Sequence, residues 1–321
     1  MRVKMNTLSQ KINLQNPAIN LPRSSIHDCY ILKFEMSIKN NGSSSATPTI
    51  TQYLEAIEQI VVTSDSTRVH YSRSGLDLAR RNAMLTKNGC DSRVLDMTFS
   101  AVAASATGSA TFVLFLDEGD IIAVMHDNLE LKVTFKGTIA TDVALTAAAV
   151  TTTIAERIPN SAAELINTYG ENFEYAAEPK VYVMTQACAA NTEFTCFFDL
   201  PTGTLLTGAM LHFSTAPEQV GILQTVPDRV ELEKIDWAEL RAVDERRFGT
   251  KIPIGVVTFD YGAQWMDNGL GKDAWNHNKG DIQIAAKAAS ATTLRYVSFE
   301  RLVNTAVFEK TGVAQIGCRF V

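Results

Sequence analysis

Short runs of β-branched and aromatic residues, separated by turn-forming residues, dominate this sequence and restrict the folds open to it. The clearest runs are rich in Val, Ile, Thr, Phe and Tyr and span residues 29–38, 59–63, 129–135, 180–184, 255–261 and 294–299. In residues 129–135 the apolar side chains fall on every second position, so one face of that strand is expected to be buried and the other to contact water. Because such alternation is typical of antiparallel sheets, we predict an all-β fold.

Three segments have the signals of helices, and they cover residues 74–85, 160–169 and 236–247. Ser74 is a good N-cap for the first segment, and Gly249 lies just beyond the last segment, where helices commonly end. Residues 160–169 lie near the middle of the chain between a proline and a glycine, so we predict that they form a linker helix.

The two halves of the chain repeat the same order of elements: strands, a helix with paired arginines, a strand with Phe, and a closing pair of strands. Phe115 and Phe259 are 144 positions apart, and so are Glu156 and Glu300. We therefore predict a tandem duplication of two similar all-β domains. The predicted division is an N-terminal arm, a first jelly roll, a linker helix, a second jelly roll and a C-terminal tail, at residues 1–23, 24–158, 159–170, 171–310 and 311–321.

Residues 97–116 carry no charge over a length that would span a bilayer. Six Ser and Thr residues interrupt the segment, and residues 105–109 form a cluster typical of turns. We therefore predict a buried hairpin with arms at 99–102 and 111–116 rather than a membrane span.

The composition is that of a folded, mildly acidic protein. Of the 321 residues 46% are hydrophobic and 20% are charged, which excludes intrinsic disorder. The net charge of -6 argues against a protein that binds the phosphates of nucleic acids. The five cysteines include no C-x-x-C pair, so we predict buried free thiols. The first eleven residues lack an apolar core typical of a secretory signal, so we expect the chain to be made in a cytoplasm.

No constellation for catalysis, cofactor binding or metal binding stands out. The chain lacks G-x-S-x-G, G-x-x-x-x-G-K-[ST], H-E-x-x-H and G-x-G-x-x-G, and its five histidines are far apart in sequence. The acidic stretch 117–120 lacks the ligand rhythm of a calcium loop, so we interpret it as a solvated turn. We predict that the protein is not an enzyme, holds no metal and needs no cofactor.

The densest aromatic group comprises Phe259, Tyr261, Trp265 and Trp275. Such residues in a β-sandwich are consistent with a sugar-stacking platform, but large aromatic residues on strands are more often core or subunit-interface anchors.

Two tandem antiparallel domains with an internal helix each fit the jelly roll. The sequence resembles double jelly-roll major capsid proteins of membrane-containing icosahedral bacteriophages in the adenovirus lineage, most closely that of a Flavobacterium-infecting, lipid-containing phage. The residues behind this resemblance are 19–23, the helix at 236–247 and a closing hairpin of 280–284 with 294–302. The resemblance concerns layout over nearly the whole chain rather than a diagnostic motif.

The resemblance implies a fold of two tandem antiparallel jelly-roll β-barrels with a few short helices. It also implies a homotrimer that forms pseudo-hexagonal capsomers of an icosahedral shell around an internal membrane, assembled in the host cytoplasm and contacting vertex or minor capsid proteins, with no sequence-specific nucleic acid. In such families the N-terminal segment points inward, so Arg2, Lys4, Lys11 and Arg23 are expected to face lipid headgroups. Trp265 and Trp275 are expected to anchor the subunit interface.

Two alternatives remain open from the sequence. A secreted carbohydrate-binding or adhesin β-sandwich module would use the aromatic group, and it predicts a signal peptide and usually disulfides. A glycosidase on a β-sandwich needs two carboxylates facing each other across a cleft, and the sequence offers no way to pair its many acids.

Overall fold

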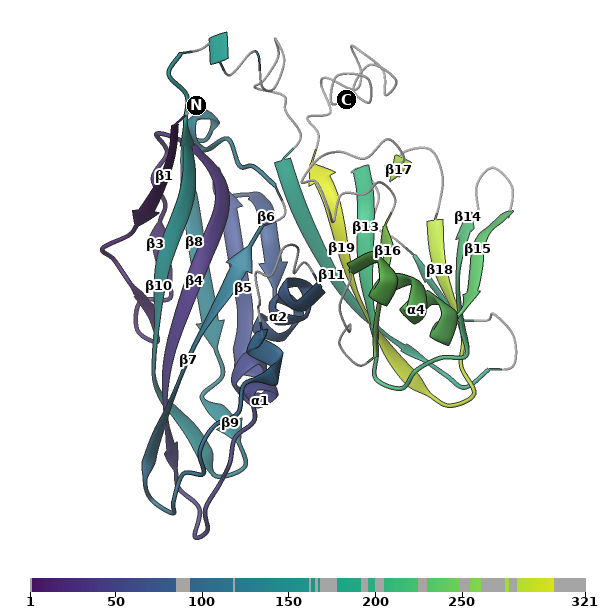
Figure 1. Ribbon diagram of the computed structural model, residues 1–321, viewed down its shortest axis with the longest axis horizontal. Helices are drawn as coiled ribbons and strands as arrows, with labels where there is room; N and C mark the ends of the chain where they lie inside the picture. Colours follow the sequence, from purple (N-terminus) through teal and green to yellow (C-terminus); the bar gives the residue numbers. More distant parts are fainter. Residues whose placement is uncertain are drawn as a thin grey trace. The chain divides into compact units, whose positions relative to one another are not determined.

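The computed structural model describes residues 2–84, 93–117, 119–161, 163–164, 167, 178–191, 196–199, 205–224, 230–248, 255–260, 275–276 and 282–302. The chain divides into two compact units, Met1–Glu174 and Tyr175–Val321 (Figure 1). Each unit contains two antiparallel sheets.

The first unit begins with β1 (Arg2–Thr7), β2 (Ile12–Asn13), β3 (Ala18–Asn20) and the long β4 (Ile26–Asn40). It continues with α1 (Ile50–Glu55), β5 (Ile57–Ser64), β6 (Arg68–Arg73), α2 (Gly75–Met84) and the 3-10 turn η2 (Arg93–Asp96). It closes with β7 (Thr107–Leu116), η3 (Ala123–Met125), β8 (Leu129–Phe135), β9 (Thr138–Ala140) and β10 (Val143–Ile158).

The second unit contains β11 (Glu178–Cys188), β12 (Cys196–Asp199), β13 (Leu205–Phe213), β14 (Gln219–Gln224) and β15 (Val230–Asp236). Helix α4 (Trp237–Phe248) follows, and the unit ends with β16 (Val256–Asp260), β17 (Trp275–Asn276), β18 (Ile282–Lys287) and β19 (Thr292–Leu302).

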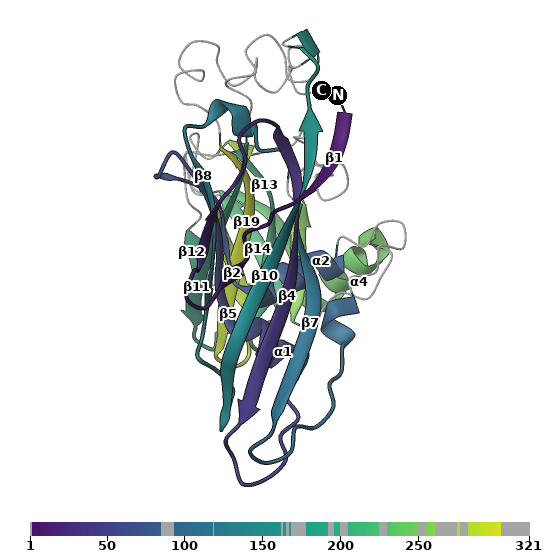
Figure 2. The ribbon, with the colours of Figure 1, turned by 90° about the vertical axis from the view of Figure 1, so that its left-hand side faces the viewer.

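Both units have the strand order of a jelly roll. The main strands of the first unit pair as β1-β10-β4-β7 and β3-β8-β5-β6, and those of the second unit pair as β11-β19-β13-β16 and β12-β18-β14-β15. Matching strands in chain order (β1 to β11, β3 to β12, and onward to β10 and β19) makes the two orders identical. Figure 2 shows β10, β4 and β7 side by side, with β1 along the end of β10. The predicted double jelly roll is therefore confirmed.

The predicted repeat lies on equivalent strands. Phe115 is in β7 and Phe259 in the matching β16, while Glu156 is in β10 and Glu300 in the matching β19. The helices α2 and α4 also occupy matching places, each between the fifth main strand of its unit and the sixth. The two residue pairs and the element order therefore predict the matching strands correctly.

The core of the first unit joins its two sheets through aromatic side chains. Phe34 of β4 stacks on Phe112 of β7 at 5.4 Å between ring centroids, and it meets Phe135 of β8 edge-on at 6.4 Å. Because β8 belongs to the other sheet, this contact closes the barrel. The predicted alternation in β8 is confirmed, since Leu129, Leu131 and Val133 are fully buried.

The second unit is built in the same way. Its core cluster joins Leu211 and Tyr296 of one sheet to Val220 and Ile284 of the other. Trp237, the first residue of α4, packs edge-on against Phe213 at 5.4 Å, so the helix is anchored on the same core.

Two of the three predicted helices are confirmed. α2 begins after Ser74, whose hydroxyl oxygen accepts a hydrogen bond from the Asp77 backbone N–H at 3.2 Å, and α4 covers the predicted segment to within one residue at each end. Most of the predicted linker helix at 160–169 lies outside the described residues, and the predicted domain limits at 158 and 171 stay a prediction.

The predicted hairpin within residues 97–116 is wrong. Thr107 and Gly108 begin β7, which pairs with β4, and Val102 forms an isolated bridge with Ala46 instead. The turn cluster misled because Gly108 is needed within the strand: a Cβ atom there would lie 2.6 Å from the Val102 side chain. No helix in the part of the chain that the structure describes is long and apolar enough to cross a membrane.

The predicted closing hairpin of residues 280–284 with 294–302 is also wrong. β18 pairs with β12 and β14, whereas β19 pairs with β11 and β13 in the other sheet. In a jelly roll these two consecutive strands pass from one sheet to the other, so adjacency in sequence does not imply pairing here.

Helices α2 and α4 protect the edge strands of their sheets. The Asn82 side chain of α2 accepts from the Phe115 backbone N–H and donates to the Phe115 carbonyl oxygen, both at 2.8 Å, and so completes the pairing that an edge strand lacks. In the second unit the Arg241 guanidinium of α4 donates to the Val256 carbonyl oxygen of β16 at 2.9 Å.

Replacing Asn82 by alanine is expected to lower the free energy of unfolding by about 1–2 kcal/mol, since two hydrogen bonds at the β7 edge are lost. The Asn82→Asp variant keeps the acceptor but places a carboxylate against the Phe115 carbonyl, so it should be destabilised as well. Urea unfolding followed by circular dichroism measures both effects. An Asn82→Ala variant as stable as the parent would show that the side-chain pairing contributes nothing.

Candidate functional site

The four basic residues of the predicted arm are distributed over separate places in the first unit. Arg2 and Lys4 lie in β1, opposite Ile158 and Glu156 of β10. Arg23 lies between β3 and β4, near the start of β4, and this start of β4 pairs with the end of β10. Arg2, Lys4 and Arg23 therefore lie toward the same end of the unit.

Two of the four charges already have partners within the chain. The Arg23 guanidinium donates to the His126 carbonyl oxygen at 3.0 Å and also to the Asp127 carbonyl oxygen, while the Lys11 ammonium lies 3.5 Å from a carboxylate oxygen of Glu35. Arg2 and Lys4 are exposed, as are Lys11 and Arg23, but Arg2 and Lys4 take no part in these contacts.

The strand β1 combines these charges with exposed apolar side chains. Val3 is 73% exposed and Met5 is 53% exposed, and they alternate with Arg2 and Lys4 along the strand. Since β1 lies at the edge of its sheet, one end of the first unit presents both cationic and apolar groups.

The predicted interface anchors lie mostly beyond what the structure describes. Trp265 lies outside the described residues. Trp275 lies in β17, whose backbone pairs with Leu206 of β13. Tyr261 of the same aromatic group also lies outside, so the interface assignment stays a prediction.

One acidic residue of the stretch 117–120 is part of an ion-pair triplet. The Arg157 guanidinium contacts the carboxylates of Asp28 and Asp120, the second at 2.9 Å. This contact ties β4, β10 and the connection after β7 together at one end of the barrel.

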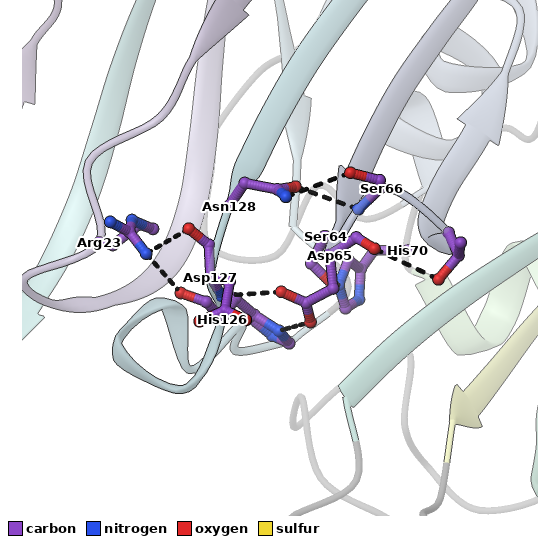
Figure 3. A network of polar contacts seen from close by, with 9 residues as sticks. Arg23, Ser64, Asp65, Ser66, His70, His126, Asp127 and Asn128 are labelled. Carbon is purple, nitrogen blue, oxygen red and sulfur yellow. Dashed lines mark hydrogen bonds and ion pairs between the residues drawn. The ribbon is translucent and has the colours of Figure 1, made fainter.

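A polar cluster occupies that end, and the sequence did not indicate it (Figure 3). The imidazole Nδ1 of His126 lies 2.8 Å from a carboxylate oxygen of Asp65, and the Asp127 backbone N–H donates to the other carboxylate oxygen at 2.7 Å. The cluster therefore joins the β5–β6 turn to the segment after η3.

The cluster stabilises a β5–β6 turn that contains two residues in the left-handed conformation. Asp65 and Ser66 have φ angles of 52° and 61°, which non-glycine residues adopt at a cost. Asn128 compensates, because its side-chain oxygen accepts from the Ser66 backbone N–H at 3.1 Å. The turn is therefore held by side chains of a segment more than sixty residues away.

Three buried histidines gather around the cluster: His27 of β4, His70 of β6 and His126. The rings of His70 and His126 are 5.5 Å apart, and His70 Nε2 lies 2.8 Å from the Ser64 hydroxyl. These residues come from distant parts of the sequence, so no local motif reveals them, and only the topology brings them together.

Burial is the main cause that lowers the pKa of His27 to about 4; a hydrogen bond to the Pro22 backbone opposes it, and the charge of His126 lowers it further. Partial burial raises the pKa of Asp65, but the hydrogen bonds from His126 and from the Asp127 backbone outweigh it, so the pKa of that carboxyl lies below its ordinary value. His27 is thus neutral and Asp65 ionised at neutral pH.

Two of the described cysteines differ in redox state. Cys29 is a free thiol, as predicted, but it is only partly buried, and Cys188 is disulfide-bonded, so the prediction of buried free thiols is wrong in part. Within the described ranges no group of three or more His, Cys, Asp or Glu residues is arranged to hold a metal ion.

Comparisons with known proteins give a match in structure only. No protein-family model and no curated protein matches the chain. The STIV major capsid protein aligns with a TM-score of 0.80 at 16% identity, covering 98% of this chain and 100% of that one. A chain from the atomic structure of Sulfolobus Turreted Icosahedral Virus aligns with a TM-score of 0.80 at 17% identity, covering 100% of this chain and 96% of that one.

The major capsid protein of bacteriophage PM2 aligns with a TM-score of 0.57 at 10% identity, covering 94% of this chain and 98% of that one. At such identities the likeness establishes the fold, and these neighbours are double jelly-roll capsid proteins.

Acidification is expected to destabilise the chain through His27. Its pKa rises from about 4 in the folded state to its ordinary value of 6.5 on unfolding, so between these pH values the unfolded chain binds a proton that the folded chain does not. The free energy of unfolding should fall by about 1.4 kcal/mol per pH unit, up to about 3 kcal/mol in total, and this contribution should stop changing below about pH 4.

The measurement is urea unfolding of the parent and of the His27→Gln variant between pH 7.5 and 4.5. The variant should lose this part of the pH dependence, while His212→Gln in β13 serves as a matched control that keeps it. Equal pH slopes in the parent and in His27→Gln would contradict the assignment.

Proposed function

We propose that the chain is a major capsid protein that forms homotrimers. The observation that carries the proposal is the match in architecture along nearly the full length of both chains, which pairs this double jelly roll with capsid proteins at 94–98% coverage of this chain. Two equivalent jelly rolls in one chain give a trimer six similar barrels, which suits a pseudo-hexagonal capsomer in a closed shell.

The proposed partner is first another copy of the chain and then neighbouring capsomers and vertex or minor capsid proteins. The proposed location is the virion, after assembly in the host cytoplasm, and no catalytic step and no sequence-specific nucleic acid enter this role. The narrower resemblance to the protein of a Flavobacterium-infecting, lipid-containing phage stays a prediction.

Light scattering after gel filtration at high salt tests the trimer. The expected mass is three times the chain mass of 35.1 kDa. Replacing Trp265 and Trp275 together by alanine should dissociate the trimer, since truncating a buried interfacial tryptophan costs about 2 kcal/mol or more. Trimers that persist in the double variant, with native circular dichroism, would rule out these anchors; a parent that is monomeric would rule out the capsomer.

We also propose that the end of the first unit bearing β1 faces an internal membrane. The support is the combination of the exposed cations Arg2 and Lys4 with the exposed side chains of Val3 and Met5 on one edge strand. Cations near an anionic surface contribute about 1 kcal/mol each, and apolar side chains add burial.

Flotation with vesicles of phosphatidylserine and phosphatidylcholine tests this contact. The Arg2→Glu/Lys4→Glu double variant should bind at least about 30-fold more weakly than the parent, as two favourable charges are lost. The matched control reverses Lys39 and Lys136, which are exposed at the opposite end of the unit. Equal loss in both double variants, or no binding by the parent, would contradict a membrane-facing β1.

The alternative role, a secreted carbohydrate-binding or adhesin module, gains one supporting observation. It predicted disulfides, and Cys188 is disulfide-bonded. A monomer that binds immobilised glycans would favour this alternative over the capsid protein.

A further inference from the structure

The connection between β7 and β8 spans residues 117–128, and we call its residues 119–128, at one end of the first jelly roll, the strap. Its residues Ile121, Ile122 and Ala123 are buried against the barrel, whereas Val124 and Met125 are exposed. The strap therefore has an apolar underside and a partly apolar outer tip.

The strap is fastened at separate points along its length. His27 and Ile121 exchange backbone hydrogen bonds at 2.8 and 2.9 Å, and the Tyr71 hydroxyl donates to the Gly119 carbonyl oxygen at 3.4 Å. At its other end His126 pairs with Asp65, and Arg23 binds the last carbonyl oxygens (Figure 3). These contacts lie outside the strand pairs of the two sheets, so lifting the strap would break them and expose its buried apolar residues while leaving the sheet ladders intact.

His27 lies under the first fastening point. Its side chain is fully buried, and its Nδ1 lies 2.8 Å from the Tyr30 hydroxyl. Ile121 pairs with the His27 backbone beside β4, and His126 of the strap is near enough for its charge to lower the pKa of the imidazole, so lifting the strap is expected to admit water to the imidazole.

The charged and titratable groups around His27 come from every neighbouring element. They are Asp28 and Tyr30 on β4, Asp65 on the turn, His70 and Tyr71 on β6, Asp120, His126 and Asp127 on the strap, Glu156 and Arg157 on β10, and Arg23 before β4. Asp28 and Asp120 contact Arg157, Glu156 accepts a hydrogen bond from Asn6, and Asp65 contacts His126. Four of these five carboxylates therefore already contact other groups, Asp127 is exposed, and His126 adds positive charge when protonated.

We propose that the strap is an acid-operated latch, in which protonation of the buried His27 favours a lifted strap that exposes Ile121 and Ile122. A proton on the covered imidazole would be a buried charge with no carboxylate of its own, and water solvates it once the strap lifts. The exposed isoleucines, next to Val124 and Met125, then form a new apolar surface at the end of the barrel. The shell protein would thus change one contact surface with the pH of its surroundings.

The size of the effect follows from the two states of the imidazole. Its pKa is about 4 under the strap, and 6.5 is the value for an exposed imidazole. The ratio of lifted to closed strap should therefore rise about tenfold per pH unit as the pH falls through this window, and by about 300-fold at most. The pKa of Asp65 lies below its ordinary value, so its carboxylate stays ionised over most of the window.

Hydrogen exchange of the full chain, read by mass spectrometry and corrected for the intrinsic pH dependence of exchange, tests the latch. Protection of amides in residues 119–126 should fall about tenfold per pH unit between pH 6.5 and 4.5. Amides in the centres of β4 and β10, such as Phe34 and Val150, should stay more strongly protected than the strap at every pH. Strap amides that match the sheet amides in protection and in pH dependence would overturn the proposal, because the strap would then open only by global unfolding.

Two substitutions make the test specific. His27→Gln and His27→Phe both remove the proton site, and at least one should fold with a strap whose protection does not change with pH. His212→Gln, in the second unit, should retain the full pH response. A pH response that persists in a folded His27 variant would overturn the latch, and this result would leave the proposed capsid role untouched.

Discussion

The antiparallel pair β4–β10 is the element on which the rest of the first unit depends. It runs from Ile26 opposite Arg157 to Asn40 opposite Val143, with irregularities only near its two ends. Its inner face supplies core residues such as Phe34 and Val150, and its two flanks receive β1 and β7. The equivalent pair β13–β19 has the same place in the second unit, flanked by β11 and β16. The membrane hypothesis and the latch hypothesis both depend on this ladder, because it fixes the positions of β1 and of His27.

Much of the fold could be predicted because strand periodicity and helix capping are local. Alternation identified β8, Ser74 marked the start of α2, and the 144-residue offset matched β7 with β16 and β10 with β19. Pairing between strands is not local, and there the prediction failed. The sequence predicts hairpins within residues 97–116 and 280–302, but β18 and β19 lie in different sheets and Val102 bridges to Ala46. Gly108 illustrates the difficulty, since a glycine typical of turns is required here by close packing within a strand.

The candidate sites show the same difference between local signals, which the sequence carries, and non-local contacts, which it does not. The basic residues of the arm were named from sequence, but only the structure separates Arg2 and Lys4 from Arg23 and Lys11, whose charges are used within the chain. His27, His70 and His126 carried no signal, because a cluster assembled from β4, β6 and the strap has no spacing that a sequence motif could express. The disulfide at Cys188 was equally hidden, and it is the one feature that the alternative role had anticipated.

Electron microscopy of the purified protein tests the central claim most directly. If the chain is a major capsid protein with two equivalent jelly rolls, class averages will show particles with three-fold symmetry in which six barrel-sized densities form a pseudo-hexagon. Each chain would then contribute two neighbouring densities. Particles that contain a single chain, or rings whose symmetry does not combine three copies of a paired barrel, would contradict the account.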